Sequence, residues 1–279
     1  MKRKNIVIAP CGNKSYLYRQ SWLKNNDKRE FDICLLFYHD QITDPLLYQD
    51  VDYFFHLKDF KYRMIYDLLT NLKPEWLNEY EYFYFLDDDI DIETDAINEL
   101  FALNKAFKAS LSCAALSHDS FCSWPIFKQA EACFLRYVGQ IEVMAPVIHN
   151  ETLNILLPTF IENRSSWGYD SVWAKLLNYS RTKMIIFDSV VMKHTLPVGG
   201  GELYIKIGVD PHMEWKDIVD KYGALPENYR EYGRLKLLTT DNNLKYKISN
   251  SFNQGIANVT RKIRDYDLKS RIKHRFSKA

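Results

Sequence analysis

The stretch EYFYFLDDDIDIET (residues 81–94) decides the fold of this chain. An aromatic, apolar run typical of a buried β-strand ends in three consecutive aspartates, Asp87, Asp88 and Asp89. Apolar residues then recur at helical spacing over 94–107, which predicts that a helix follows the acids. In open α/β sheets ligands bind at the carboxyl ends of the strands, so the acids mark a candidate site.

Strand-like and helix-like segments alternate on both sides of this stretch. We expect strands at residues 5–9, 31–38, 51–57, 82–86, 111–116, 140–146 and 184–193. We expect helices at residues 15–24, 61–72, 94–107, 150–160 and 166–178. The alternation predicts an α/β sandwich of three layers, in which a mixed, mostly parallel sheet lies between helices.

Length and composition favour one main domain. The chain has 279 residues, of which 47% are hydrophobic and 26% charged, as in ordinary folded domains. Aromatic residues, at 15%, fit a large core and also fit sites that stack against sugars. Because the sequence contains no linker or repeat, we expect one domain over residues 1–210 and a helical C-terminal extension over 211–279.

The net charge of +1 is unevenly distributed along the chain. Residues 261–278 include eight basic and two acidic residues, so this segment carries +6 and the rest of the chain −5. Interleaved apolar residues would allow the segment to lie on an anionic membrane surface; a solvated, frayed terminus is the alternative. The negative balance of the remaining chain argues against nucleic acid as a partner.

The cysteines and the N-terminus indicate the compartment. Cys11, Cys34, Cys113, Cys122 and Cys133 show no C-x-x-C spacing, which argues against a disulfide framework or a zinc site. The apolar run near the N-terminus is too short for a signal peptide, and no later run is long enough to span a membrane. We therefore expect a cytoplasmic protein that contacts the inner membrane face, if at all, through its basic segment.

The three aspartates differ in direction. Side chains alternate along a strand, so Asp87 and Asp89 point to one side and Asp88 points to the other. Two neighbouring carboxylates repel each other unless a cation lies between them or one of them takes up a proton. Mn²⁺ or Mg²⁺, completed by water and substrate phosphates, suits such oxygen ligands. We expect Asp87 and Asp89 to bind the metal; a solvated acidic turn is the alternative.

Two enzyme classes place D-x-D directly after an apolar strand. Haloacid-dehalogenase-like phosphatases prefer Thr or Val two positions after the second aspartate, where this chain has Asp91. Nucleotide-sugar transferases of the GT-A type use the acids to hold a metal under the donor's diphosphate. D-x-D alone does not distinguish the two classes, so the rest of the chain has to.

A wider resemblance covers roughly residues 30 to 200. The segments FDICLLFYHD, KYRMIYDLL, YEYFYFLDDDID, VGQIEVMAPVIHNETLNIL, SSWGYDSVW and IFDSVVMKHTLPVGG occur in this order. Together they resemble a plant and bacterial family described as a domain of unknown function and regarded as GT-A-like glycosyltransferases. The acidic motif of that family is usually D-E-D, so Asp88 replaces a Glu while Asp87 and Asp89 stay in place.

This resemblance implies a set of roles in the second half of the chain. Asp170, in the sequence WGYD, would be the general base that takes a proton from the acceptor hydroxyl, while capping of the following helix is the alternative. Trp167 and Gly168 would contact a sugar. His194, after a strong apolar strand, would complete the metal shell, although a lone histidine is more often structural.

The same resemblance suggests where the donor and the acceptor lie. GT-A folds place the nucleotide after the first strand, so donor contacts are expected from Pro10, Gly12, Asn13, Asp40, Lys61, Arg63, Asp87 and Asp88. Exposed Lys and Arg are usually only solvated, which is the alternative for the two basic residues. A carboxylate in an apolar segment needs a partner, so Glu142 becomes a candidate contact for acceptor or sugar.

The sequence therefore predicts a metal-dependent glycosyltransferase of the GT-A type that inverts the anomeric configuration. The donor is a nucleotide sugar, with UDP-sugars first, and the acceptor is a glycan or lipid-linked hydroxyl. A metal-dependent phosphohydrolase and a non-catalytic glycan-binding protein on a transferase fold are the alternatives.

Overall fold

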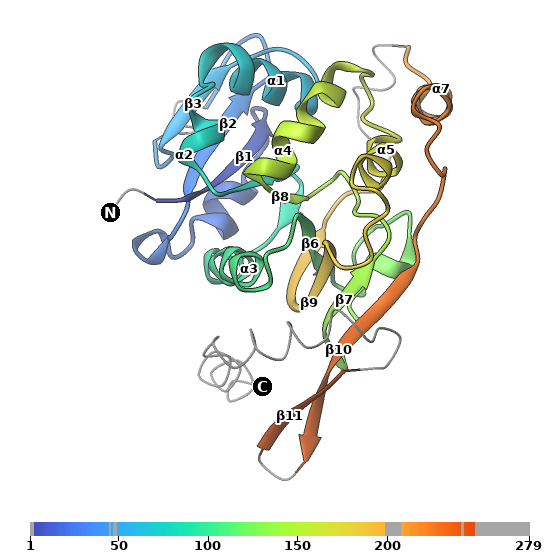
Figure 1. The fold of residues 1–279 in the computed structure, drawn as a ribbon. Coiled ribbons are helices and arrows are strands. Elements are labelled where there is room, and N and C mark those ends of the chain that lie inside the picture. The colour runs from blue at the N-terminus through green and yellow to red at the C-terminus, as the bar shows by residue number, and fades with distance from the viewer. Residues whose placement is uncertain (1–2, 45, 47–48, 199–207, 241–242, 249–279) are drawn as a thin grey trace.

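The chain is described here by a computed structural model, which covers residues 3–44, 46, 49–198, 208–240 and 243–248. Its centre is one extended sheet with helices on both faces (Figure 1). The basic segment 261–278 and the glycines at 199–201 lie outside the described residues. No helix in the described ranges is long and apolar enough to cross a membrane.

The sheet is mixed, with most strands running one way. Its order is β11-β10-β7-β9-β6-β8-β4-β1-β2-β3, and β8, β7 and β11 run against the direction of the others on this path. The strand bounds are β1 Asn5–Cys11, β2 Asp32–Phe37, β3 Tyr53–His56, β4 Tyr82–Phe85, β5 Ile90–Asp91, β6 Leu111–Leu116, β7 Cys133–Val138, β8 Val147–His149, β9 Met184–His194, β10 Glu231–Thr240 and β11 Asn243–Ile248. The short β5 pairs with the end of β9.

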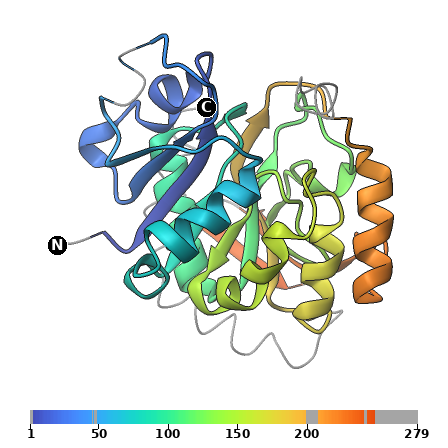
Figure 2. The same cartoon turned by 90° about the horizontal axis from the view of Figure 1, so that it is seen from above.

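Helices cover both faces of the sheet. The α-helices are α1 Lys61–Asp67, α2 Trp76–Glu79, α3 Thr94–Phe107, α4 Asn150–Leu156, α5 Tyr169–Leu176 and α7 Pro211–Tyr222. Short π and 3-10 turns are η1 Tyr18–Trp22, η2 Asn26–Lys28, η3 Leu68–Leu72, η4 Pro125–Phe127 and η5 Leu157–Ile161. Helix α3 packs with η1 and η2 on one face, while α1, α4, η5, α5 and α7 adjoin one another on the other (Figures 1 and 2). The predicted α/β fold class is confirmed.

The core explains the aromatic excess. All four residues of β4 are buried, because helices cover both sides of the strand. On one face Tyr62, Phe160, Tyr169 and Trp173 pack edge to face or stacked, with the Tyr62 and Phe160 ring centroids 4.7 Å apart. Such pairs add stability beyond the area that they bury. Tyr62 and Phe160 of this cluster also pack against Phe85, the last residue of β4.

Three predictions of local structure were wrong. The strand expected at 140–146 is a loop whose apolar residues, such as Ile141, are nevertheless buried, and β8 begins only at Val147. The helix expected at 15–24 is reduced to the π turn η1. Strand β7 was not predicted, because its run CFLRYV is interrupted by the buried Arg136.

The chain after residue 211 differs from the expected helical extension. Helix α7 is present, but β10 then pairs with β7 and so extends the central sheet. Pro226 and Tyr229, just before β10, are hydrogen-bonded to Ser171 and Asp170 at the start of α5. The domain boundary at residue 210 stays a prediction, although the chain beyond it contributes a strand to the same sheet.

Candidate functional site

A short backbone ladder joins the aspartates to His194. In the β5–β9 pair Ile90 lies opposite His194, so the imidazole reaches back to the residue that precedes β5. The His194 Nε2 atom lies 3.1 Å from Asp89 Oδ2, and Nδ1 lies 3.0 Å from the carbonyl oxygen of Phe121. Both partners are acceptors, so a ring that makes both bonds carries two protons. Burial lowers the pKa of His194, but the hydrogen bond and charge of Asp89, together with the Phe121 carbonyl and the charge of Asp87, outweigh burial and raise the pKa overall.

Asp89 has one carboxylate oxygen left over. Its backbone carbonyl accepts bonds from the backbone N–H and the hydroxyl of Thr195, at 3.1 and 2.8 Å. Its Oδ2 faces His194, whereas Oδ1 is buried and has no hydrogen-bond partner among the described residues. Burying a carboxylate oxygen without a partner costs free energy, so this oxygen is suited to accept a hydrogen bond or to bind a cation.

Asp87 is paired with a lysine from α1. The Lys61 Nζ atom lies 2.7 Å from Asp87 Oδ1 and also donates to the carbonyl oxygens of Met144, at 2.7 Å, and Val143, at 3.2 Å. Burial lowers the pKa of Lys61, and the charge of Asp87 opposes that shift. The charge of Lys61 therefore compensates one of the negative charges of Asp87, Asp88 and Asp89.

Asp88 points the other way, as the strand period predicts. Its Oδ2 accepts bonds from the hydroxyls of Ser15 and Tyr38, which follow β1 and β2. Burial raises the pKa of Asp88 to about 6. Ser15 in turn accepts a bond from the Gly12 N–H at 2.7 Å, so Asp88 fixes the loop after β1.

The donor set partly fits a hard divalent metal. Carboxylate oxygens are the ligands that Mn²⁺ and Mg²⁺ prefer, and the free Oδ1 of Asp89 next to Asp87 supplies one such oxygen. Within the described ranges, however, no group of three or more His, Cys, Asp or Glu is arranged to hold a metal. Lys61 is already paired with Asp87, and His194 is already paired with Asp89. These residues thus fit a metal that takes one or two protein carboxylates and completes its shell with phosphate and water.

Asp170 lies at the start of α5 and has both oxygens occupied. Oδ2 accepts a hydrogen bond from the hydroxyl of Tyr229, and Oδ1 accepts one from the N–H of Ser171 at 2.9 Å. Only 9% of the residue is exposed, and burial raises the pKa of its carboxyl group. The ring of Tyr229 stacks on Trp124 with centroids 4.3 Å apart, which holds the hydroxyl on the carboxylate.

Glu142 lies in the loop between β7 and β8, where the charges of both Asp170 and Asp87 act on its carboxyl group. Burial, followed by the charge of Asp170, raises the pKa of Glu142 to about 7. Asp87 raises this pKa further, while His194 and Lys61 lower it. The Oε2 atom of Glu142 is buried and accepts no hydrogen bond from the part of the chain that the structure describes.

The raised pKa of Glu142 predicts a pH-dependent stability. The folded state keeps a proton that the unfolded chain loses near the ordinary value of 4.5, so stability falls as pH rises from there to about 7. Glu142→Gln removes this effect. At about pH 8 the variant is expected to be more stable than the wild type, by on the order of 1–3 kcal/mol, and the two should match at about pH 4. Urea titrations at both pH values test this, and an equal difference at both would contradict it.

Several residues predicted to bind the donor have other partners. Pro10 is buried inside β1, which runs on to Cys11, rather than in the loop. Asp40 is exposed and pairs with Lys58. Arg63 donates to the backbone carbonyls of residues 161 and 163, at 3.1 and 3.3 Å. Pro10 continues the register in which Ile8 pairs with Phe85, so it lies beside the start of the aspartates, and the donor contacts of Pro10, Asp40 and Arg63 stay predictions.

The remaining predicted contacts, Gly12, Asn13, Trp167 and Gly168, pack against neighbouring loops and helices. Asn13 bonds to the loop after β2 through the Gln41 carbonyl at 2.9 Å, and a Cβ at Gly12 would meet Tyr38 at 2.7 Å, so only glycine fits there. Gly168 adopts a φ of +89° at the start of α5, close to α7. Trp167 packs its ring against His212 with centroids 4.9 Å apart.

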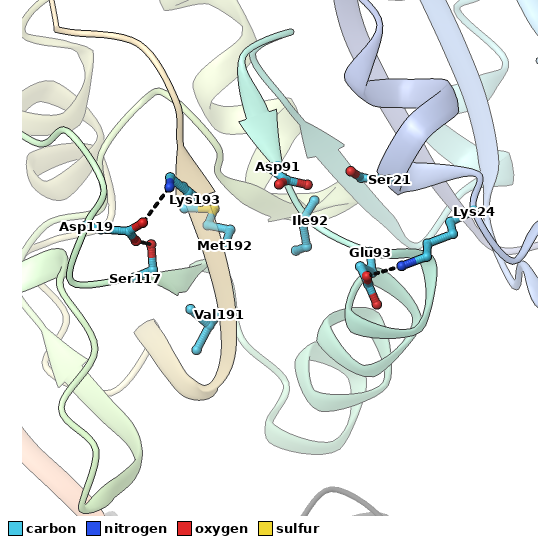
Figure 3. A pocket seen from close by; sticks show the side chains of 10 residues that line it. All are labelled: Ser21, Lys24, Asp91, Ile92, Glu93, Ser117, Asp119, Val191, Met192 and Lys193. Atoms are coloured by element: carbon cyan, nitrogen blue, oxygen red, sulfur yellow. Dashed lines mark hydrogen bonds and ion pairs between the residues drawn. The ribbon is translucent and has the colours of Figure 1, made fainter. Parts of the chain in front are cut away.

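A separate open pocket of about 450 Å³ lies beside β5 and β9 (Figure 3). Its lining includes two lysines whose charges are paired inside it, Lys24 with Glu93 and Lys193 with Asp119. None of the aspartates at 87–89, nor Glu142, Asp170 or His194, is among its described lining residues. The pocket is therefore distinct from the carboxylate site.

Sequence reasoning missed the residues that hold the site from a distance. Ser15, Tyr38, Tyr229 and Gln140 each bond to a candidate residue or to its neighbour. Nothing in the local pattern distinguishes them from other surface-prone polar residues. Only Gln140 offered a signal, since it precedes Glu142 in an apolar segment and itself needs a partner.

Comparisons with known proteins give distant structural likenesses. No family model matches the sequence, and no curated protein matches it closely enough to indicate a relationship. A crystal structure of S. aureus TarS 1-349 in complex with UDP-GlcNAc is 11% identical over 78% of this chain and 65% of that chain, with a TM-score of 0.47. S. aureus TarS is 13% identical over 69% of this chain and 37% of that chain, with a TM-score of 0.44.

A third likeness is A197 from STIV, 14% identical over 70% of this chain and 86% of that chain, with a TM-score of 0.40. The chain thus spans about two thirds of the TarS fragment and much less of the longer TarS chain. Since no family model matches, the resemblance to the plant and bacterial family stays a prediction. The assignment of a function depends on the geometry of the site.

Proposed function

We propose that this protein is a metal-dependent glycosyltransferase that uses a nucleotide-sugar donor. The observation that carries the proposal is the buried Oδ1 of Asp89, after the carboxyl end of β4, which has no hydrogen-bond partner among the described residues. A divalent cation bound together with a diphosphate would supply the positive charge that this oxygen lacks. Ligands of open α/β folds bind at the carboxyl ends of the strands, which supports this location.

The chain's own residues take distinct roles in this proposal. Asp87 and Asp89 bind the metal, and His194 orients Asp89 through its 3.1 Å bond. A metal held by Asp87 and Asp89 would supply positive charge for the leaving diphosphate. Lys61 balances Asp87 and adds positive charge on the same side. The acceptor hydroxyl gives its proton to a buried carboxylate, either Asp170, which the sequence predicts, or Glu142.

The proposed acceptor is a glycan or lipid-linked hydroxyl, and the proposed outcome is inversion. Trp124, which stacks on Tyr229 beside Asp170, offers an aromatic ring near that carboxylate, and aromatic rings suit contact with sugars. The basic segment 261–278 would bring the enzyme to the cytoplasmic face of an anionic membrane. Nucleic acid is not proposed as a partner.

A thermal-shift screen tests the proposal. UDP-, GDP-, CMP- and dTDP-sugars, with UDP-GlcNAc among them, are added with and without Mn²⁺. One nucleotide class is expected to stabilise the protein only with metal, by about 2.7 kcal/mol at a hundred times its Kd. Product analysis then determines whether the anomeric configuration is inverted.

Other outcomes separate the alternatives. Indifference to every nucleotide sugar would contradict the proposal. Phosphate release from p-nitrophenyl phosphate, lost in Asp87→Asn, would indicate a phosphohydrolase instead. Glycan binding that survives Asp89→Ala and Asp170→Asn, without product, would indicate a non-catalytic binding protein.

A further inference from the structure

The loop at residues 140–144 is fastened at both ends. At one end the side chain of Gln140 donates to Ser171 Oγ at 3.1 Å and accepts from the N–H of Asn228 at 2.8 Å. At the other end the Met144 carbonyl accepts from the Asp87 N–H at 3.2 Å and from Lys61 Nζ at 2.7 Å. Glu142 therefore lies in a loop that is held beside Asp170 at one end and beside Asp87 at the other.

Glu142 and Asp170 differ in what their oxygens do. Both oxygens of Asp170 accept hydrogen bonds, from Tyr229 and Ser171, and donors on a carboxylate make it a weaker base. Glu142 Oε2 is buried and unpartnered within the described chain, so a hydroxyl group brought to it would satisfy it. Among the described residues, Glu142 thus has a buried oxygen without a partner, whereas both oxygens of Asp170 already accept a hydrogen bond.

The charges around Glu142 are mixed. Asp170 and Asp87 are the anions that face it, and His194 and Lys61 are the cations. Cys113, Cys122 and Tyr229 are the uncharged titratable groups nearby. Anions and burial together raise the pKa of Glu142 to about 7, so its ionised form is a stronger base than an ordinary carboxylate.

We propose that Glu142, rather than Asp170, takes the proton of the acceptor hydroxyl, and that Asp170 is a positioning residue held by Tyr229. This inference rests on the proposed glycosyltransferase function. As the acceptor O–H bond breaks, the proton moves to Glu142 Oε2 and the acceptor oxygen bonds to the anomeric carbon. The bond from that carbon to the diphosphate oxygen breaks, and its electron pair leaves with the nucleoside diphosphate. Glu142 then returns the proton to solvent.

The test uses water and azide as acceptors, because the natural acceptor is not identified. The full-length protein is loaded with Mn²⁺ and the nucleotide sugar that stabilises it in the screen, and release of the nucleoside diphosphate is measured. Glu142→Gln is expected to lower release to water about 10²- to 10⁴-fold, with the donor's thermal shift kept. Azide needs no deprotonation, so it is expected to restore release in Glu142→Ala and to yield a glycosyl azide.

Matched variants make the outcome decisive. Glu151→Gln, at an exposed residue, is the neutral control. Tyr229→Phe removes the hydroxyl that bonds to Asp170, so we expect its pH profile to differ from that of the wild type and azide not to restore its activity. Release by Glu142→Gln within about threefold of wild type, azide rescue of Asp170→Ala instead of Glu142→Ala, or a product of retained configuration would each overturn the assignment. If no nucleotide sugar stabilises the wild type, the proposed function itself fails and this assignment fails with it.

Discussion

Asp89→Asn is expected to remove the metal-dependent stabilisation by the donor and to lower turnover at least about 10³-fold. The amide keeps the shape of the side chain but loses the charge on Oδ1, the buried oxygen that lacks a partner within the described residues. A metal that stabilises the leaving charge contributes several kcal/mol, and each 1.36 kcal/mol is about tenfold in rate. Turnover and the Mn²⁺ dependence of the donor's thermal shift measure the effect.

Asp91→Asn is the matched control for Asp89→Asn. Asp91 lies two residues further along, in β5, and lines the separate pocket rather than the carboxylate site. Its variant should keep both turnover and metal dependence. If Asp91→Asn lowered turnover as much as Asp89→Asn, a general loss of local charge, and not a metal-binding oxygen, would explain the result.

Asp188→Ala is expected to destabilise the fold by about 3–5 kcal/mol, because it leaves a buried guanidinium without its partner. Arg136 in β7 binds both oxygens of Asp188 in β9 at 2.9 Å, and the two side chains are 6% and 0% exposed. Equilibrium unfolding in urea measures the change. Arg136 is therefore a structural partner of Asp188.

A surface ion pair serves as the comparison. Asp119, paired with Lys193, is largely exposed, so Asp119→Ala should change stability little. Arg136→Met with Asp188→Leu together should cost much less than Asp188→Ala alone, because no charge is then left buried. Equal losses for Asp188→Ala and the double variant would show that packing, and not the uncompensated charge, determines the effect.

The N-terminal half of the fold and the acid site could be predicted because local signals agree there. The run before Asp87 is continuously apolar, and a strand that drives into acids is rare enough to indicate a site. His194 was placed near the aspartates from its position after a long apolar strand, and the β5–β9 pair brings it to 3.1 Å from Asp89. What Asp87, Asp89 and His194 bind stays a prediction.

The rest depended on contacts between distant segments. QIEVMAP has the apolar content of a strand, but it is a loop because Gln140 and Lys61 hold its ends. Lys61 was expected on the donor; it binds Asp87, a partner that no local pattern indicated, and its contact with the donor stays a prediction. Tyr229 lies 59 residues from Asp170, and no local pattern reports such a hydrogen bond.

The return of the chain after α7 has a consequence for biosynthesis. On a ribosome the strands β1 to β4 and the three aspartates emerge early, whereas the phenol that holds Asp170 and the amide that holds Gln140 come from residues 229 and 228. A nascent chain that stops before residue 228 contains the three aspartates but lacks the two groups that hold Asp170 and Gln140 in place. Translation must therefore pass residue 229 before the two halves of the site can act as one.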